Sequence, residues 1–160
     1  MNKTSENLFP SDRCTPVLPS PLVRRLGYAG LLPFVLLATL PWTVPAHLHG
    51  FLAVALVAYG AVIASFLGGV HWGIAAQLPP GDAAFHYVWG VTPSLLAWGA
   101  VLLPASAGLP FLGLILTACY LVDKQSSPRV GWAAWLPMRL KLTVVAMLSC
   151  VLSAATAGNL

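Results

Sequence analysis

Histidines and a few charged residues are the side chains in this sequence whose types could do chemistry. His71 and His86 flank a short turn rich in proline and glycine, and Asp82 lies within that turn. Imidazole titrates near neutral pH, so histidines beside a carboxylate can hydrogen-bond, relay protons or hold a ligand. We predict that the turn brings both histidines to one level with other charged groups. The predicted polar cluster has five members: His71, His86, Asp82, Asp123 and Arg139.

The cluster has a structural and a functional interpretation, and we favour the structural one. Ionisable groups inside a membrane are costly and are functional candidates by default. These groups, however, fall near the ends of apolar segments, where water, headgroups or one another can satisfy them. A proton pump would usually need a charged residue near the midplane, and none is predicted there. If both histidines could be replaced by Gln without loss of fold or phenotype, the hypothesis of a polar cluster would be contradicted.

Metal, haem and enzyme chemistry receive little support from the remaining motifs. His47 and His49 lie in the stretch AHLHG, but a closed metal site needs three or four ligands, and no acidic or thiol residue is expected on that side. Haem ligation by His71 with His86 stays open as an alternative. The sequence has no HExxH, GxSxG or phosphate-binding loop. We therefore predict no enzyme, no catalytic residue, no metal and no cofactor.

The composition indicates which elements must position these residues. Of 160 residues, 58% are hydrophobic and 8% are charged, whereas a soluble domain carries about 25% charged residues. A short soluble chain could not hide that much apolar surface, so the lipid bilayer must be its solvent. We predict an all-α, polytopic membrane helix bundle. Residues 1–25 are expected to be a disordered polar tail, and residues 26–160 a single transmembrane domain.

Five apolar segments approach the length of about 20 residues that a membrane-spanning helix needs. The fourth is the shortest and the least certain, and Pro33 and Pro93 are expected to bend the first and third. The first could also imitate a secretory signal peptide, but the long polar region before it favours a retained span. The predicted spans cover residues 26–42, 50–76, 86–103, 107–122 and 140–157.

The basic residues predict the orientation. All eight Lys and Arg residues precede the first predicted span or flank the connection before the fifth. Because Lys and Arg concentrate in short cytoplasmic loops, five spans put the N-terminus inside and the C-terminus outside, with the polar cluster on the cytoplasmic side. The net charge of +4 is explained by this bias and by anionic lipids, so no nucleic acid partner is expected.

Small residues at four-residue spacing predict how the helices pack. Membrane helices associate through close packing, and small side chains permit that approach. The second predicted span carries such a stripe over three turns, and we predict that it is a helix-packing ridge. Its members are Ala61, Ser65, Gly69 and Gly73.

Three stretches of the sequence resemble signature blocks of a known family. They are YGAVIASFLGGVHWG from Tyr59, VTPSLLAWGAVLLP from Val91 and WAAWLPMRLKLT from Trp132. The family consists of small polytopic proteins of unknown function and includes bacterial inner-membrane proteins and eukaryotic transmembrane protein 69. One departure is Leu136, where the family more typically has Tyr after Trp. The resemblance implies several spans and a bacterial inner (cytoplasmic) membrane location, but no reaction or ligand.

Three classes of function remain, and we rank them. A structural, assembly or partner-binding membrane protein comes first, because the segment with Trp132 and Trp135 could anchor at the inner surface or dock a membrane-protein partner. A small transporter or channel comes second and would need a homo-oligomer at this size. A histidine-using redox subunit comes last.

Overall fold

The computed structural model describes residues 18–126 and 132–157, and within them the chain is a helix bundle without a β-strand. This confirms the all-α prediction. The long elements are α1 (Pro21–Ala29), α2 (Leu32–Thr39), α3 (His49–Ala75), α4 (Pro80–Leu102), α5 (Ala105–Ser126) and α6 (Leu136–Ala157). Short 3-10 turns extend three of them: η1 (Leu40–Trp42), η2 (Ala46–Leu48) and η4 (Ala133–Trp135).

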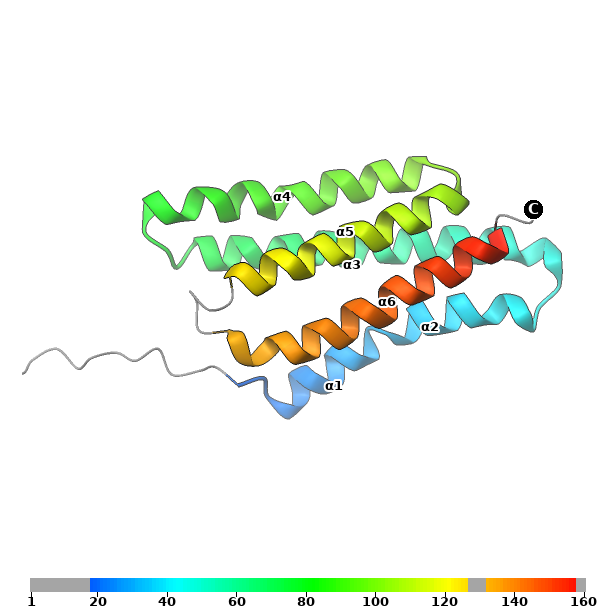
Figure 1. The fold of residues 1–160 in the computed structure, drawn as a ribbon, viewed down its shortest axis with the longest axis horizontal. Helices are drawn as coiled ribbons and strands as arrows, with labels where there is room; N and C mark the ends of the chain where they lie inside the picture. Colours follow the sequence, from blue (N-terminus) through cyan, green and yellow to red (C-terminus); the bar gives the residue numbers. More distant parts are fainter. Residues whose placement is uncertain (1–17, 127–131, 158–160) are drawn as a thin grey trace, which may run out of the picture.

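The helices run back and forth along one axis (Figure 1). α3 and α4 form the most extensive pair, and α5 packs on both of them and on α6. α2 lies against α3 and α6, so the first and last parts of the chain are side by side. The α3–α4 turn, the end of α5 and the starts of α1 and α6 share one end of the bundle. We call it the inner end because the orientation predicted from the sequence would place it at the cytoplasm.

Four helical segments of the described residues are long and apolar enough to cross a membrane. They are Pro21–Trp42, Ala46–Ala75, Ala105–Ser126 and Ala133–Ala157. The doubt about residues 107–122 was therefore wrong, because α5 is a 22-residue helix. α4 is not among these four segments, although residues 86–103 were predicted to be a span. Its 23 residues are enough for a span, but His86, Thr92 and Ser94 make it less apolar.

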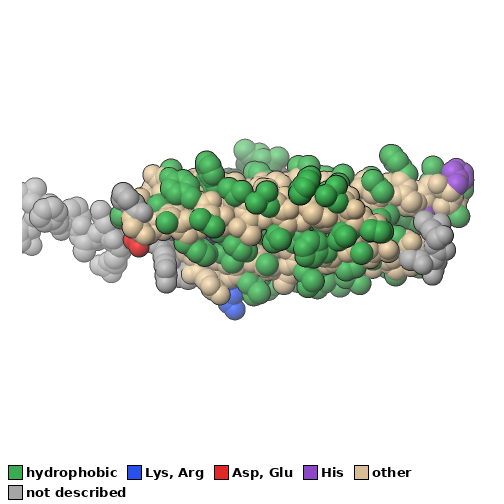
Figure 2. All heavy atoms as spheres, turned by 90° about the horizontal axis from the view of Figure 1, so that it is seen from above, with side chains coloured by type: hydrophobic (Ala, Val, Ile, Leu, Met, Phe, Trp, Pro, Cys, Tyr) green, Lys and Arg blue, Asp and Glu red, His purple; other side chains and the backbone are tan. Residues whose placement is uncertain are grey.

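The outer surface has the character of a membrane protein (Figure 2). Hydrophobic side chains cover the face in view, and the few charged side chains visible there lie toward the inner end. Large apolar side chains point outward on every long helix, including Phe51 at 71% exposure and Val88 at 70%. In water an apolar surface this continuous would drive aggregation, so lipid is the solvent that it fits.

The first span is broken into two helices at Gly30 and Leu31. Pro33 lies in the first turn of α2 and has no N–H to bond the carbonyl one turn back, which ends α1. Tyr59 of α3 donates its hydroxyl to the Gly30 carbonyl at 2.8 Å. The Tyr59 hydroxyl thereby satisfies a backbone oxygen at the break.

The beginning of the first span lies earlier than predicted. α1 begins at Pro21, and the Ser20 hydroxyl accepts a hydrogen bond from the Val23 N–H at 3.3 Å. Serine before a proline at the first helical position is a favoured helix start. The boundary predicted at residue 25 therefore lies inside a helix. The predicted disorder of residues 1–17 lies outside the described part of the chain.

The predicted packing ridge is out of register by one residue. Gly69 and Gly73 are exposed, and a β-carbon on either would meet no atom within 4 Å. Ala61 and Ser65 are half-buried. The stripe that packs is Gly60, Ala64 and Gly68, all buried. The buried face of α3 also includes His71, whereas the predicted face does not.

Gly68 and Gly90 let the backbones of α3 and α4 approach each other closely. A β-carbon on Gly68 would collide with the Gly90 carbonyl oxygen, and one on Gly90 would collide with the Trp72 ring. Only glycine lets two backbones approach this closely. The crossing fixes the rotation of α3 about its axis and so places His71 in the interior.

Candidate functional site

Four helices each contribute one side chain to a polar cluster at the inner end of the bundle. His71 comes from the last turns of α3 and His86 from the early part of α4. Asp123 lies near the end of α5 and Arg139 near the start of α6. The structure thus brings together four of the five residues predicted for the cluster.

Asp82 lies apart from the other four. It is exposed in the first turn of α4, where a carboxylate interacts favourably with the positive end of the helix dipole. His86 follows one turn later and is buried at 7% exposure. The two residues share a face of α4, but about one helical turn along its axis separates the exposed Asp82 from the buried His86.

The two histidine rings are in direct contact. Nδ1 of His71 and Nδ1 of His86 are 2.9 Å apart, and the rings stack with centroids 5.2 Å apart. His71 is 1% exposed and directs its other nitrogen, Nε2, to Oδ1 of Asp123 at 3.1 Å. Both ring nitrogens of His71 are therefore engaged.

Arg139 completes the cluster from the opposite side of the carboxylate. Its Nε donates to Oδ2 of Asp123 at 2.8 Å, and one terminal nitrogen of the guanidinium also contacts Oδ2. The side chains are 19% and 16% exposed, so solvent screens this ion pair only weakly. The two formal charges cancel, which reduces the cost of holding them between helices.

The hydrogen-bond geometry allows two proton arrangements. When His71 is neutral and donates from Nε2 to Asp123, its Nδ1 accepts a hydrogen bond from the Nδ1–H of His86. When His71 is protonated, it donates to both neighbours and His86 accepts. The cluster can thus hold one additional proton on His71 without breaking either contact.

Trp89 is a neighbour of the cluster that the sequence reasoning missed. Its ring meets His71 edge-on, with centroids 6.5 Å apart, and its buried Nε1 has no hydrogen-bond partner among the described residues. Trp89 lies three positions after His86 on α4, and this spacing places both residues on one helix face. The same spacing, read from the sequence, could have identified Trp89 as a neighbour of His86.

Beside the cluster lies a cleft of about 490 Å³, which we call the α1–α3–α6 cleft. His71, Asp123 and Arg139 form its polar floor. Trp132 and Trp135 lie at its edge, stacked with centroids 5.9 Å apart. The remaining wall is mostly apolar and comprises Val23, Leu26, Gly27, Phe66, Leu67, Val70, Ile74, Ser126, Met138 and Leu142.

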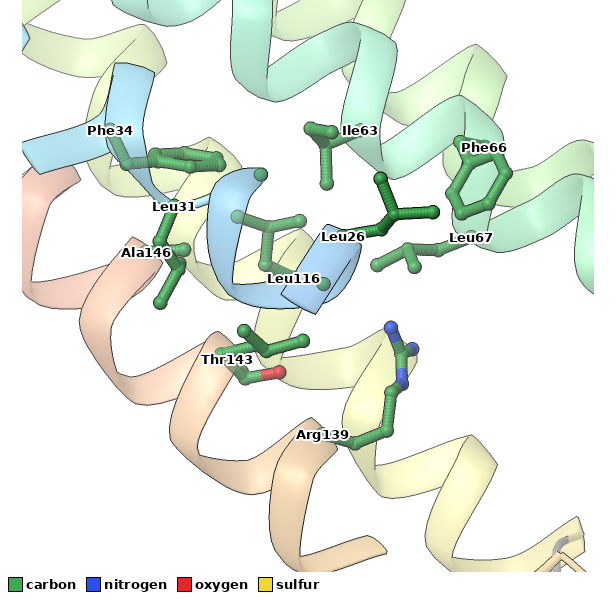
Figure 3. A pocket seen from close by; sticks show the side chains of 13 residues that line it. Leu26, Leu31, Phe34, Ile63, Phe66, Leu67, Leu116, Arg139, Thr143 and Ala146 are labelled. Atoms are coloured by element: carbon green, nitrogen blue, oxygen red, sulfur yellow. The ribbon is translucent and has the colours of Figure 1, made fainter. Parts of the chain in front are cut away.

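A second pocket of about 180 Å³ adjoins the cleft toward the middle of the bundle (Figure 3). Arg139 extends from α6 toward this pocket, and Leu26 of α1 faces Phe66 and Leu67 of α3 across it. The two cavities share six wall residues: Leu26, Gly27, Phe66, Leu67, Arg139 and Leu142. Together they form one apolar path that starts at the polar cluster.

The histidines at the other end do not form a comparable site. His49 places Nε2 at 3.3 Å from the Val44 carbonyl, and His47 is exposed. Across residues 18–126 and 132–157, no three His, Cys, Asp or Glu side chains are grouped so as to hold a metal ion.

The fold and surface define the class of this protein as a polytopic membrane protein, a bundle of apolar helices with its polar groups gathered at one end. The chain belongs to the family described as "Protein of unknown function (DUF3429)", which matches residues 19–155. It is 39% identical over 135 residues to transmembrane protein 69 of Xenopus tropicalis, which covers 79% of this chain. The chain spans about half the length of that relative, 51%. Among solved structures, none matches significantly.

Proposed function

We propose that this protein is a non-catalytic binding protein of the membrane that holds a hydrophobic partner in the α1–α3–α6 cleft. The observation that carries the proposal is the cleft itself, about 490 Å³ of mostly apolar space beside an ion pair. Sites that bind specific molecules combine apolar walls with a few convergent polar groups in this size range. This role refines the expectation of a structural, assembly or partner-binding protein.

The hydrogen bonds within the cluster support a binding role rather than a catalytic one. Both ring nitrogens of His71 and both oxygens of Asp123 already have partners. A general base must instead be free to reach a substrate proton. In the proposed role the cluster joins the inner ends of α3, α4, α5 and α6 and keeps the floor of the cleft rigid.

The proposed setting is a bacterial inner membrane, with the inner end of the bundle in the cytoplasm and the C-terminus outside. The charge distribution supports this orientation. Every Lys and Arg of the described residues belongs to a helix end at the inner end. Cytoplasmic loops carry such an excess.

Photocrosslinking in native membranes tests the proposed role. A photoreactive amino acid at Leu67 faces the cleft, whereas the same group at Val62, which is 65% exposed and lines neither cavity, faces lipid. We expect a discrete adduct from position 67 and only a broad mixture of bulk lipid adducts from position 62.

The adducts can be compared quantitatively. Mass spectrometry of the purified chain should give one dominant adduct at position 67, approaching one per chain at full photoactivation. Identical bulk lipid mixtures at both positions would show that nothing specific occupies the cleft and would overturn the proposed function.

A further inference from the structure

We infer that the occupant of the α1–α3–α6 cleft is an amphiphile with a long apolar chain and an uncharged head whose carbonyl oxygen accepts a hydrogen bond from Arg139. This inference rests on the proposed binding role and names its ligand class. Diacylglycerol-type lipids and isoprenoid quinones share this chemistry.

The walls fit a long apolar chain. The cleft and the adjoining pocket, about 490 and 180 Å³, meet along shared residues of α1, α3 and α6. Phe66 and Leu67 of α3 oppose Leu26 of α1 along this path (Figure 3). A chain lying there would contact apolar side chains along its length, while its head stayed beside Arg139.

The floor provides hydrogen-bond donors. A guanidinium has five N–H groups, and Arg139 uses Nε and one terminal nitrogen on Asp123. No residue in the described part of the chain accepts from its other terminal nitrogen. Arg139 lines both cavities, so a carbonyl oxygen entering the cleft can reach an unused donor.

The charge of the floor selects an uncharged head. Arg139 and Asp123 form an ion pair whose formal charges cancel. An anionic head would leave one uncompensated negative charge in a poorly screened site, because Asp123 already neutralises Arg139, and an unpaired charge there is costly. A carbonyl dipole accepts the same hydrogen bond without that penalty.

One wall of the cleft is a helix whose side chains are exposed on the outer surface of the bundle. Leu26 of α1 is 63% exposed, and α1 as a whole buries no residue, so one wall of the cleft is a lipid-facing helix. Trp132 and Trp135 stack at the edge, and tryptophan favours the level where headgroups begin. A ligand entering from the membrane would thus carry its head at the depth of the cluster.

Labelling with three photoreactive lipids tests the inference on the full chain in mild detergent. The probes are a diacylglycerol, a quinone analogue with an isoprenoid tail, and phosphatidic acid as the anionic comparison. We expect at least one uncharged probe to label α6 near Arg139, at least tenfold more strongly than phosphatidic acid. The relative labelling by the first two probes identifies the source of the head.

Matched glycine variants report whether the label lies in the cleft. Gly27→Phe fills the cleft and should reduce labelling at least tenfold, whereas Gly69→Phe, with open space around it, should leave it unchanged. Gly27→Ala controls for folding, because its methyl group meets only the flexible Met138 and Leu142 side chains at 3.5 and 3.6 Å.

Two results would overturn the ligand class. One is labelling by phosphatidic acid that equals or exceeds labelling by both uncharged probes. The other is labelling that Gly27→Phe does not reduce. A discrete protein adduct from Leu67 would also refute the amphiphile while supporting the proposed binding role, so the two failures are distinguishable.

Discussion

Asp123 is the residue through which the polar cluster is connected, since it touches both His71 and Arg139. Removing its carboxylate leaves a mostly buried guanidinium without a counter-charge. We expect Asp123→Ala to lower the free energy of unfolding by about 3 kcal/mol, the scale for breaking a buried ion pair from one side. Unfolding in mixed micelles with increasing dodecyl sulfate measures this loss.

The double variant Asp123→Asn with Arg139→Gln provides the comparison, because it removes both charges and keeps side chains that can hydrogen-bond. We expect it to be less destabilised than Asp123→Ala alone. Lys141→Gln, at an exposed position on α6, serves as the surface control. A double variant as unstable as the single one would show that charge pairing is not what the cluster contributes.

The Tyr59 hydroxyl illustrates a second single-residue effect. It donates to the Gly30 carbonyl at the break in the first span. Tyr59→Phe leaves that oxygen unsatisfied and should cost about 1 kcal/mol, in the upper range for hydrogen bonds between membrane helices. The same unfolding titration measures it, with Tyr28→Phe on α1 as the control, because no described hydrogen bond uses the Tyr28 hydroxyl. Equal stability of Tyr59→Phe and wild type would contradict the assigned role.

The sequence predicted the members of the site better than their roles. His71, His86, Asp123 and Arg139 could be grouped because each falls near a predicted inner helix end. Sequence position did not separate Asp82 from them, since a turn residue and a core residue can be one helical turn apart. Which side chains contact one another within the cluster depends on the rotation of α3 about its axis, and the crossing at Gly68 and Gly90 sets that rotation.

At the scale of elements, the α3–α4 crossing gives the sharpest test of the packing register. Gly68→Ala puts a methyl group onto the Gly90 backbone, which cannot rotate away as a side chain could. We expect a loss of about 1–3 kcal/mol, typical of overpacking. The matched control, Gly69→Ala, adds the same methyl group into open space and should change stability by less than about 0.5 kcal/mol.

The two alanine variants together distinguish the alternatives. A greater loss of stability from Gly69→Ala than from Gly68→Ala would show that the helix-packing ridge predicted from the sequence is the one that packs. That prediction had the spacing right and the face wrong. Small residues occur at both Gly60, Ala64, Gly68 and Ala61, Ser65, Gly69, so the four-residue pattern alone could not choose between adjacent faces. His71 would have chosen the first, since it lies three residues after Gly68.

For the whole molecule, the proposed orientation predicts which connections reagents can reach. In a background with Cys14, Cys119 and Cys150 replaced by Ser, a cysteine in place of exposed Thr43 tests the outer end. A cysteine in place of exposed Lys124 tests the inner end. A membrane-impermeant maleimide should label Thr43→Cys in intact bacterial spheroplasts, and Lys124→Cys only after permeabilisation. The reverse pattern would overturn the orientation.

The number of long helical segments could be predicted from the sequence, whereas their relative depth and contacts could not. Apolar runs of the right length predict spans directly because the bilayer fixes that length. α4 shows the limit. His86 is buried against His71 of α3, and hydropathy cannot tell a polar group that faces lipid from one that faces protein.

The position of α2 against α6 has a consequence for biogenesis. Among the described helices, the first span is made before α3, α4 and α5, whereas α6, one of its principal neighbours, is made after them. α1 buries no side chain of its own, and the α2–α6 contact that holds the first span cannot form until α6 has been made. Docking of α2 onto α6 is therefore a late step of assembly. A nascent protein that stalls before α6 would leave its first span unattached, where membrane quality control can recognise it.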